Sequence, residues 1–208
     1  MDSVAKVRSR YESASRFYDH IERLPIISSL EKRYRLEAVK MLRARAGETL
    51  VEIGCGTGVM LAIASRLYPG TRLVGVDISP RMLEILQNKV LGCRAVLADA
   101  ADLPIEDGFA DHVLVAYALT IISDPEGAVK EIYRILKPGG TVAVLDSCRP
   151  TSLPLNLVFP MANLISSTVG YTRMDRDIEK LLMRYFEQIG YHSYCGGFVF
   201  SSLMGKSP

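Results

Sequence analysis

The stretch Val51-Glu52-Ile53-Gly54-Cys55-Gly56-Thr57-Gly58 decides the fold of this chain. It ends an apolar segment, 49–53, that has the character of a buried strand. It leads into a second apolar segment, 59–67, whose spacing predicts a helix. A strand, a glycine-rich turn and a helix in this order are typical of a doubly wound α/β sheet that holds a nucleotide-like cofactor at the turn.

Two details of the turn indicate the charge of that cofactor. In the dinucleotide fingerprint a third glycine would stand at position 59, where this chain has Val59. Glu52 would place a negative charge beside a diphosphate, and the repulsion would be costly in a poorly solvated crevice. Next to a cation the same carboxylate is favourable. Because S-adenosylmethionine carries a sulfonium and an ammonium and has no phosphate, the turn predicts a site for this cofactor.

Polar side chains follow the later strands that the sequence predicts. The segments expected as strands are 72–76, 94–98, 111–116 and 141–145, and the residues that follow them are Asp77, Asp99, Tyr117 and Asp146. Since the ends of parallel strands meet at one edge of a sheet, these side chains should surround one crevice. We expect Asp77 to accept both ribose hydroxyls of the cofactor, and Asp99-Ala100 to meet the exocyclic amine of its adenine.

Four motifs resemble the core motifs of class I S-adenosylmethionine-dependent methyltransferases. They are Glu52-Ile-Gly-Cys-Gly-Thr-Gly, Gly75-Val-Asp77-Ile-Ser79, Ala98-Asp99-Ala-Ala-Asp-Leu-Pro104 and Tyr133-Arg-Ile-Leu-Lys-Pro-Gly-Gly140. The opening Tyr11-Glu-Ser-Ala-Ser-Arg-Phe-Tyr-Asp19 also resembles the start of the UbiE-like branch, which methylates quinone precursors and, in some bacterial members, phospholipid headgroups. The resemblance implies S-adenosylmethionine as cofactor, bound by Tyr11, Glu52, Gly54, Cys55, Gly56, Asp77, Ile78, Met82, Asp99, Ala100 and Ala116.

The resemblance also implies the fold, a doubly wound α/β sheet of seven strands whose last strand is antiparallel. A length of 208 residues and a hydrophobic share of 49% suit a single domain. We expect four parts in that domain: an N-terminal helical cap (1–47), a cofactor-binding core (48–148), a substrate-side insertion (149–175), and a terminal helix and β-hairpin (176–208). Within the core a helix is expected over 125–136, followed by the stop Lys137-Pro138-Gly139-Gly140.

The terminal part reads as a helix over 177–189, followed by two strands. The strands, 191–195 and 198–204, are joined by Gly196-Gly197, which is a signal for a two-residue hairpin.

Charge is distributed unevenly although the net charge is only +2. Residues 1–47 carry eleven Lys/Arg against six Asp/Glu, whereas residues 48–150 carry nine against thirteen. Ser28 and Glu31 form a capping-box pattern at the start of a helix in the basic part. One face of this helix is apolar, and the other carries Lys32, Arg33, Arg35, Lys40 and Arg43. The basic face is either an ordinary solvated surface or a contact with anionic lipid headgroups.

Other features bound the location and partners of the protein. The start of the chain, 1–11, is polar and lacks a secretory pattern, which favours a cytoplasmic protein with possible peripheral membrane contact. The four cysteines are widely spaced, so we expect free thiols and no metal site. The small net charge and the lack of an aromatic-plus-basic pattern argue against nucleic acid. The sequence does not indicate an oligomeric state.

The insertion indicates the acceptor class. Residues 150–171 are apolar, interrupted by Pro154 and Pro160, and too short and polar for a membrane span. In the family an insertion here helps to roof the substrate pocket, and an apolar roof suits a lipophilic acceptor, either a quinone precursor or a phospholipid amine. The segment is equally compatible with an amphipathic cap on the sheet edge.

Catalysis by in-line displacement needs alignment and the exclusion of water, and it needs a base if the acceptor starts protonated. The candidates are Tyr117 and Asp146 at strand ends, and Tyr18 and His20 from the N-terminal part. Family members usually have a histidine after strand four, where this chain has Leu119-Thr120-Ile121-Ile122. Two alternatives to a lipophilic acceptor stay open: methylation of a soluble metabolite, and a non-catalytic regulator that binds S-adenosylmethionine.

Overall fold

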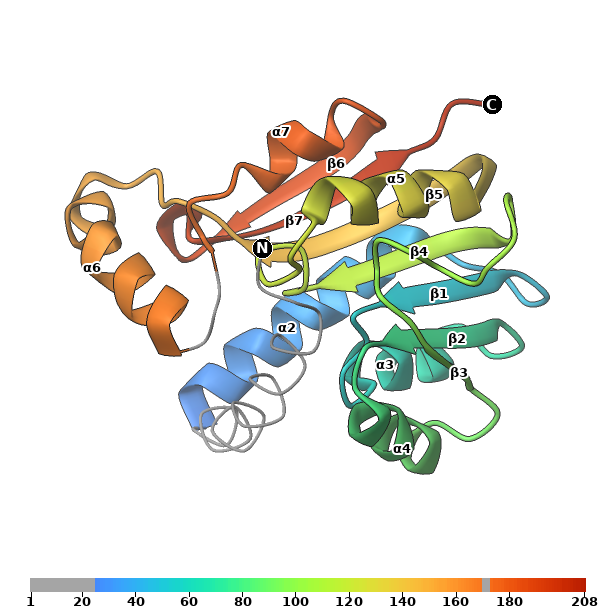
Figure 1. Cartoon of the computed structure of the whole chain (residues 1–208). Helices are drawn as coiled ribbons and strands as arrows, with labels where there is room; N and C mark the ends of the chain where they lie inside the picture. The colour runs from blue at the N-terminus through green and yellow to red at the C-terminus, as the bar shows by residue number, and fades with distance from the viewer. Residues whose placement is uncertain (1–24, 170–172) are drawn as a thin grey trace.

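A seven-stranded sheet runs through the computed structural model, which describes residues 25–169 and 173–208 (Figure 1). The strands are β1 (Thr49–Ile53), β2 (Arg72–Asp77), β3 (Arg94–Leu97), β4 (Ala110–Ala116), β5 (Leu136–Ser147), β6 (Glu187–Tyr194) and β7 (Val199–Gly205). Their order across the sheet is β3-β2-β1-β4-β5-β7-β6. Strands β1 to β5 are parallel, and β7 is antiparallel to both of its neighbours. The α/β sheet of seven strands with an antiparallel last strand is therefore confirmed.

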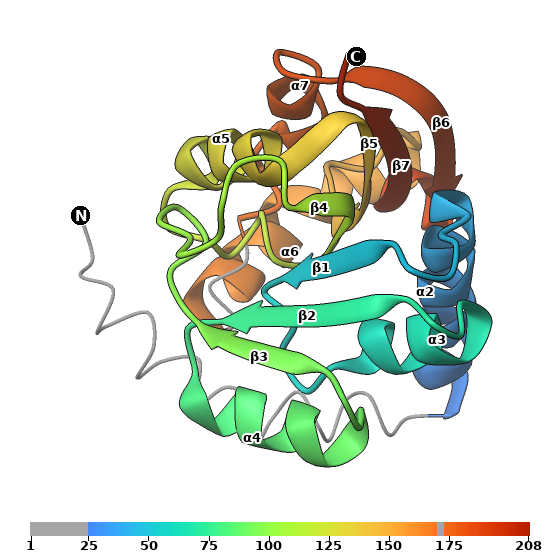
Figure 2. The same ribbon diagram turned by 90° about the vertical axis from the view of Figure 1, so that its right-hand side faces the viewer.

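Helices cover both faces of the sheet (Figures 1 and 2). On one face lie α2 (Pro25–Leu42), α3 (Val59–Leu67) and α4 (Pro80–Lys89), and on the other lie α5 (Pro125–Ile135) and α7 (Ile178–Leu182). The remaining helix, α6 (Leu153–Val169), lies beyond the ends of β4 and β5, clear of both layers (Figure 1). The N-terminal helical cap is confirmed by α2.

The central strands bury both of their faces, because successive side chains of a strand point to opposite sides. In β5, Val142 and Val144 pack with α5 and α7, whereas Ala143 and Leu145 pack with α2 and α3. Each face thus has its own apolar core.

Two helix boundaries differ from the sequence-based expectation. The capping-box start at Ser28 is wrong, since α2 begins at Pro25, and proline is well suited to a first turn. The helix expected over 177–189 is also wrong. It does begin after Asp177, whose Oδ1 accepts a hydrogen bond from the Lys180 N–H at 3.0 Å. It ends at Leu182, because residues 187–194 pair with β7 as strand β6.

The turn after β6 is longer than the expected two-residue hairpin, because β6 ends at Tyr194 and β7 begins at Val199. The chain passes through a 3₁₀ turn, Cys195–Gly197, in which Cys195, Gly196 and Gly197 all have positive φ, at 50°, 65° and 86°. The predicted glycine pair therefore does lie at the reversal. In the insertion the sequence suggested interruption by prolines, yet α6 is continuous from Leu153 to Val169 with Pro160 inside it.

Lys206 ties the last strand to the end of α5. Its Nζ donates to the carbonyl oxygens of Tyr133 and Leu136, both at 2.7 Å, and lies 4.4 Å from the centre of the Tyr133 ring. We expect Lys206→Met to lower the free energy of unfolding by about 1.5–3 kcal/mol, the usual worth of hydrogen bonds from a charged group. Urea denaturation measures this change.

Lys130→Met is the matched control for Lys206→Met. Lys130 is exposed and pairs with Glu126 at 3.3 Å one helical turn away, so its loss should lower the free energy of unfolding much less than the loss of Lys206. Equal effects of the two substitutions would contradict the role given to Lys206.

Candidate functional site

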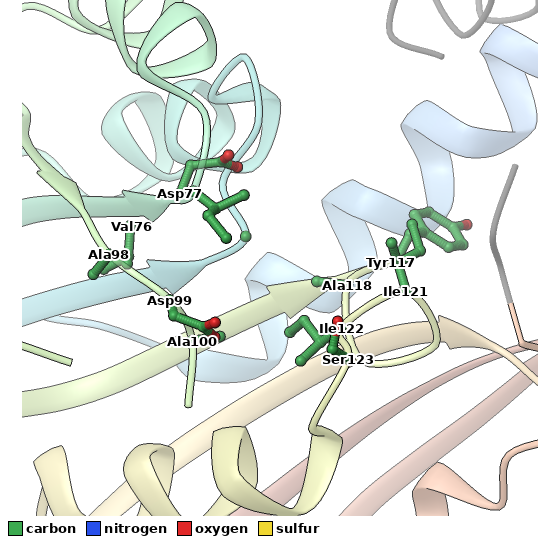
Figure 3. A pocket seen from close by; sticks show the side chains of 12 residues that line it. Val76, Asp77, Ala98, Asp99, Ala100, Tyr117, Ala118, Ile121, Ile122 and Ser123 are labelled. Carbon is green, nitrogen blue, oxygen red and sulfur yellow. The ribbon is translucent and has the colours of Figure 1, made fainter. Parts of the chain in front are cut away.

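A pocket opens at the edge of the sheet where the parallel strands end (Figure 3). Its walls come from the turn after β1, the end of β2, the loop after β3 and the loop after β4. The lining residues are Gly54, Val76, Asp77, Ile78, Ala98, Asp99, Ala100, Tyr117, Ala118, Ile121, Ile122 and Ser123. The charged side chains among them are two carboxylates, and the wall formed by the loop after β4 is apolar. The pocket therefore suits a cation with a flat apolar part.

The glycine turn brings the backbone close to this pocket. Gly54 has φ +67°, and a Cβ on it would lie 2.7 Å from the Cβ of Ala118. Gly58 has φ +75°, and a Cβ there would collide with the side chain of Leu86. Both positions require glycine, because a side chain would separate the turn from the β4 loop or from α4. The turn predicted from the sequence thus forms one wall of the pocket.

Asp77 fixes the turn from the neighbouring strand. One of its carboxylate oxygens accepts from the Gly56 N–H at 2.8 Å and the other from the Ser79 N–H at 2.9 Å. The side chain is buried, which raises the pKa of Asp77, while the two backbone donors act in the opposite direction. A carboxylate has about four acceptor positions, so the ribose contact expected for Asp77 remains possible beside these two bonds.

Asp99 shapes the loop after β3. Its Oδ1 accepts from the Ala101 N–H at 3.0 Å, which closes an Asx-type turn at the pocket wall. Asp99 and Ala100 line the pocket (Figure 3). Ile78 also lines it, as the expected contacts of all three residues with the cofactor require.

Glu52 is a buried carboxylate with unused bonding capacity. The residue is 2% exposed, and its Oε2 is buried without a hydrogen-bond partner among the described residues. Burial raises the pKa of Glu52 to about 8, opposed by the charge of Arg35. Two further buried atoms near the pocket, Ser79 Oγ and Tyr117 Oη, also lack a partner there. Three unsatisfied polar atoms around one crevice fit a ligand that carries hydrogen-bonding groups.

Arg35 is the functional candidate that sequence patterning misplaced. It was expected on the solvated face of α2, but its side chain is only 15% exposed and turns inward. Its guanidinium lies 5.3 Å from the centre of the Tyr117 ring and bonds Glu31 at 3.2 Å. Next to the buried carboxylate of Glu52, this cation complements the amino-acid end of S-adenosylmethionine. Arg35 can pair with the cofactor's carboxylate and Glu52 can pair with its ammonium.

The two candidate bases at the strand ends are placed differently. Tyr117 lines the pocket in a left-handed conformation, φ 53°, and its N–H donates to the Leu145 oxygen at 2.7 Å. Burial, reinforced by the charge of Glu31, raises the pKa of its phenol. A phenol with a raised pKa is a hydrogen-bond donor at neutral pH, so the geometry favours a donor role for Tyr117 over a role as base.

Asp146 lies behind the pocket wall and is not among the residues that line it. Its oxygens accept from the Thr120 hydroxyl at 2.7 Å and from the Ser147 N–H at 2.8 Å. Burial raises the pKa of Asp146 to about 6. With these partners Asp146 is placed to position the loop that carries Thr120.

The loop after β4 is also held by residues that follow α6, and the sequence did not indicate these contacts. Arg176 donates to the Leu119 oxygen at 3.2 Å and the Ile122 oxygen at 2.5 Å, and the Arg173 N–H donates to the Thr120 oxygen at 2.9 Å. The apolar wall of the pocket is therefore fixed between Asp146 and the segment that follows α6.

The remaining predicted residues fall into two groups. Cys55 and Met82 are buried beside the site, and Ala116 packs with the core under α2. Tyr11, Tyr18 and His20 lie outside the described residues.

Cofactor affinity should depend on pH through Glu52. Its raised pKa means that the folded protein binds this proton more tightly than the unfolded chain. Its contribution to stability is therefore full below about pH 4.5 and is lost as the pH rises through about 8. A bound cation favours the ionised form, so we expect S-adenosylmethionine binding to release a proton and to tighten by up to about tenfold per pH unit below pH 8. Titration calorimetry in buffers of different ionisation enthalpy counts the released protons.

Glu52→Gln should bind more weakly and with a much flatter profile between about pH 6 and about pH 8, because the carboxyl group whose pKa is raised to about 8 is no longer present. A flat profile in the unmodified protein would exclude Glu52 from cofactor binding.

Arg35→Met should weaken S-adenosylmethionine binding by about tenfold to a hundredfold, the equivalent of one charge-assisted hydrogen bond. Arg33→Met is the matched control, since Arg33 is 71% exposed and bonds Glu37 on the same helix. The affinity of Arg33→Met for S-adenosylmethionine should stay within about twofold of that of the unmodified protein. Similar losses in both variants would mean a general effect of charge and would contradict the assignment of Arg35.

Comparison with known proteins identifies the family. The model of a methyltransferase domain matches residues 51–144. A demethylmenaquinone methyltransferase of Tropheryma whipplei is 32% identical over 187 residues, which are 85% of this chain and 77% of the relative. One of Desulfitobacterium hafniense is 33% identical over 72% of this chain, and the match spans 62% of that relative, less than two thirds of its length.

A crystal structure agrees in fold over nearly the whole chain. The Thermotoga maritima protein described as a SAM-dependent methyltransferase, possible histamine N-methyltransferase, is 26% identical with a TM-score of 0.72. The alignment covers 95% of this chain and all of that one, 100%. The chain belongs to the class I S-adenosylmethionine-dependent methyltransferases, within the UbiE-like branch that its demethylmenaquinone methyltransferase relatives represent.

Proposed function

We propose that this protein transfers a methyl group from S-adenosylmethionine to a lipophilic acceptor of the quinone-precursor type. The observation that carries the proposal is the division of the pocket: acids on the β2 and β3 side, and an apolar wall on the β4 side. The acids suit the cationic cofactor, and the apolar wall suits an aromatic or isoprenoid acceptor. The names of the relatives, demethylmenaquinone methyltransferase, support the same acceptor class.

The residues of this chain contribute mainly by positioning. The bound cofactor supplies a methyl group that is already activated by its sulfonium. Arg176 and Asp146 hold the loop whose side chains Ile121 and Ile122 face the pocket. A fixed apolar wall keeps the acceptor in line and keeps water out, and alignment of this kind lowers a barrier by several kcal/mol, about 7 in good cases.

Tyr117 is placed to orient the acceptor. Its hydroxyl is buried without a partner among the described residues, and its phenol stays protonated at neutral pH. A quinol or quinone oxygen can accept a hydrogen bond from this hydroxyl. In this proposal the proton released from the acceptor is taken by a group other than Asp146, whose oxygens are engaged behind the wall.

The test is methyl transfer to defined acceptors. The purified protein is incubated with tritiated-methyl S-adenosylmethionine and one of three compounds: a reduced isoprenoid naphthoquinone without its ring methyl, phosphatidylethanolamine, or histamine. We expect protein-dependent counts in the organic phase with the naphthoquinol, abolished by excess S-adenosylhomocysteine.

Each other outcome selects a different function. Counts with phosphatidylethanolamine alone would indicate headgroup methylation, and counts with histamine alone would indicate a soluble amine acceptor. If S-adenosylmethionine binds by calorimetry but no acceptor is labelled, including the lipid and aqueous fractions of a bacterial extract, the protein is a non-catalytic regulator.

A further inference from the structure

Helix α6 presents large apolar side chains on its outward face. Leu153, Leu157 and Met161 are 80%, 80% and 66% exposed. Their spacing of four residues places them in one stripe along the helix, and Leu164, which is 63% exposed, continues it. A helix on the surface of a soluble domain normally presents polar residues on its outward side, so α6 has the opposite pattern.

The opposite side of α6 is the one that contacts the fold. Phe159 is 5% exposed, and the Arg149 guanidinium lies 5.8 Å from the centre of its ring. Arg149 also donates to the side chain of Asn156 at 2.9 Å. The Leu155 side chain approaches Gly196 in the turn between β6 and β7. The docking of α6 therefore leaves the outward stripe exposed.

The insertion carries a net positive charge, although one of its two basic residues, Arg173, pairs with Asp175 at 3.1 Å. Between Asp146 and Asp175 the chain contains no acidic residue, and its charged residues there are Arg149 and Arg173, one on each side of α6. The exposed Lys32 and Arg33 lie on α2, the helix that contacts the turn between β6 and β7, and Arg33 pairs with Glu37 at 2.9 Å. The next residue, Tyr34, bonds Cys195 at 3.2 Å, and Cys195 adjoins the glycine that Leu155 approaches.

We propose that α6 docks on an anionic lipid bilayer, with its outward stripe in the boundary between headgroups and acyl chains. An uncharged helix with large apolar residues on one face and basic residues at its flanks is suited to lie in that plane. No helix within residues 25–169 and 173–208 is long and apolar enough to cross a membrane, so α6 would lie on the surface. A soluble protein partner would instead be expected to meet some charged or hydrogen-bonding groups.

The position of α6 relates membrane docking to the proposed reaction. This step of the inference rests on the proposed lipophilic acceptor. The helix lies beyond the ends of β4 and β5, at the same edge of the sheet as the pocket (Figures 1 and 3). An acceptor held in a bilayer would then reach the pocket from the side on which α6 docks.

The first test uses a fluorescent residue at the stripe. The chain has no tryptophan, so Leu157→Trp introduces a single reporter. Its emission should be that of a solvated indole in buffer and should shift to the blue when vesicles of phosphatidylcholine and phosphatidylglycerol are added. Leu91→Trp is the matched control, because Leu91 is 90% exposed in the turn between α4 and β3, and its emission should not shift.

The second test is vesicle flotation without any acceptor. Leu157→Glu should lower the partition coefficient about tenfold or more, since removing a leucine side chain from water is worth one to two factors of ten in an equilibrium constant. Leu91→Glu, with the same change of charge, should float like the unmodified protein. Charge reversal of Lys32 and Arg33 should reduce binding to the anionic vesicles and weaken its dependence on salt.

Several results would overturn the proposal. Blue emission of Leu157→Trp in buffer alone would mean that the stripe is covered by the protein itself, either by its own chain or by a second copy, which sedimentation would distinguish. Equal flotation of Leu157→Glu and Leu91→Glu, or no flotation of the unmodified protein, would also exclude it. Because flotation needs no turnover, these failures are separate from failure of the proposed methyl transfer, which a water-soluble short-chain naphthoquinol would still reveal.

Discussion

The carboxylate of Asp77 is the contact on which the geometry of the site depends. It belongs to β2, yet it accepts hydrogen bonds from Gly56 in the turn after β1 and from Ser79 at the start of α4. Two strand-to-helix connections are therefore fixed by one side chain, and the turn can approach the β4 loop only because Gly54 has no Cβ. Asp77, which would face the ribose, therefore also holds the turn that forms the wall beside it. A substitution of Asp77 would change the ligand contact and the local structure together.

A second constraint is the burial of acidic side chains at a site where the residues that line the pocket include no Lys, Arg or His. Glu52 and Asp77 are both deeply buried, and the charge of Asp77 adds to burial in raising the pKa of Glu52. Such a site is favourable only when a cation is supplied, either by a ligand or by the protein. Arg35 supplies part of that charge from α2, over the ring of Tyr117. The N-terminal helix is thereby a component of the electrostatics of the site as well as a cover on the sheet.

The sequence predicted the parts of the molecule that depend on local pattern. The strand and turn around Glu52 follow from hydrophobic period and glycine spacing, and the strand-end acids follow from the topology that this pattern predicts. Arg35 was misplaced because helical spacing fixes which residues share a face, but not whether a long side chain folds back under a neighbouring loop. Helix α7 was predicted with the right start but too long, because pairing with β7 overrides the helical preference of residues 187–189. Local sequence pattern could not identify Arg176, because its partners are backbone oxygens 57 and 54 residues away in the sequence.

These non-local contacts connect the end of the insertion that follows α6 to the pocket. Before α6, Arg149 bonds Asn156 of the helix itself; after it, Arg173 and Arg176 bond the loop that forms the apolar wall. The segment after α6 also contacts the helix, because the Met174 N–H donates to the Asn163 side chain at 3.1 Å, and Thr120 is held from the other side by Asp146. The insertion and the β4 loop therefore form one structural unit, because residues that follow α6 hold the loop that shapes the pocket an acceptor would enter.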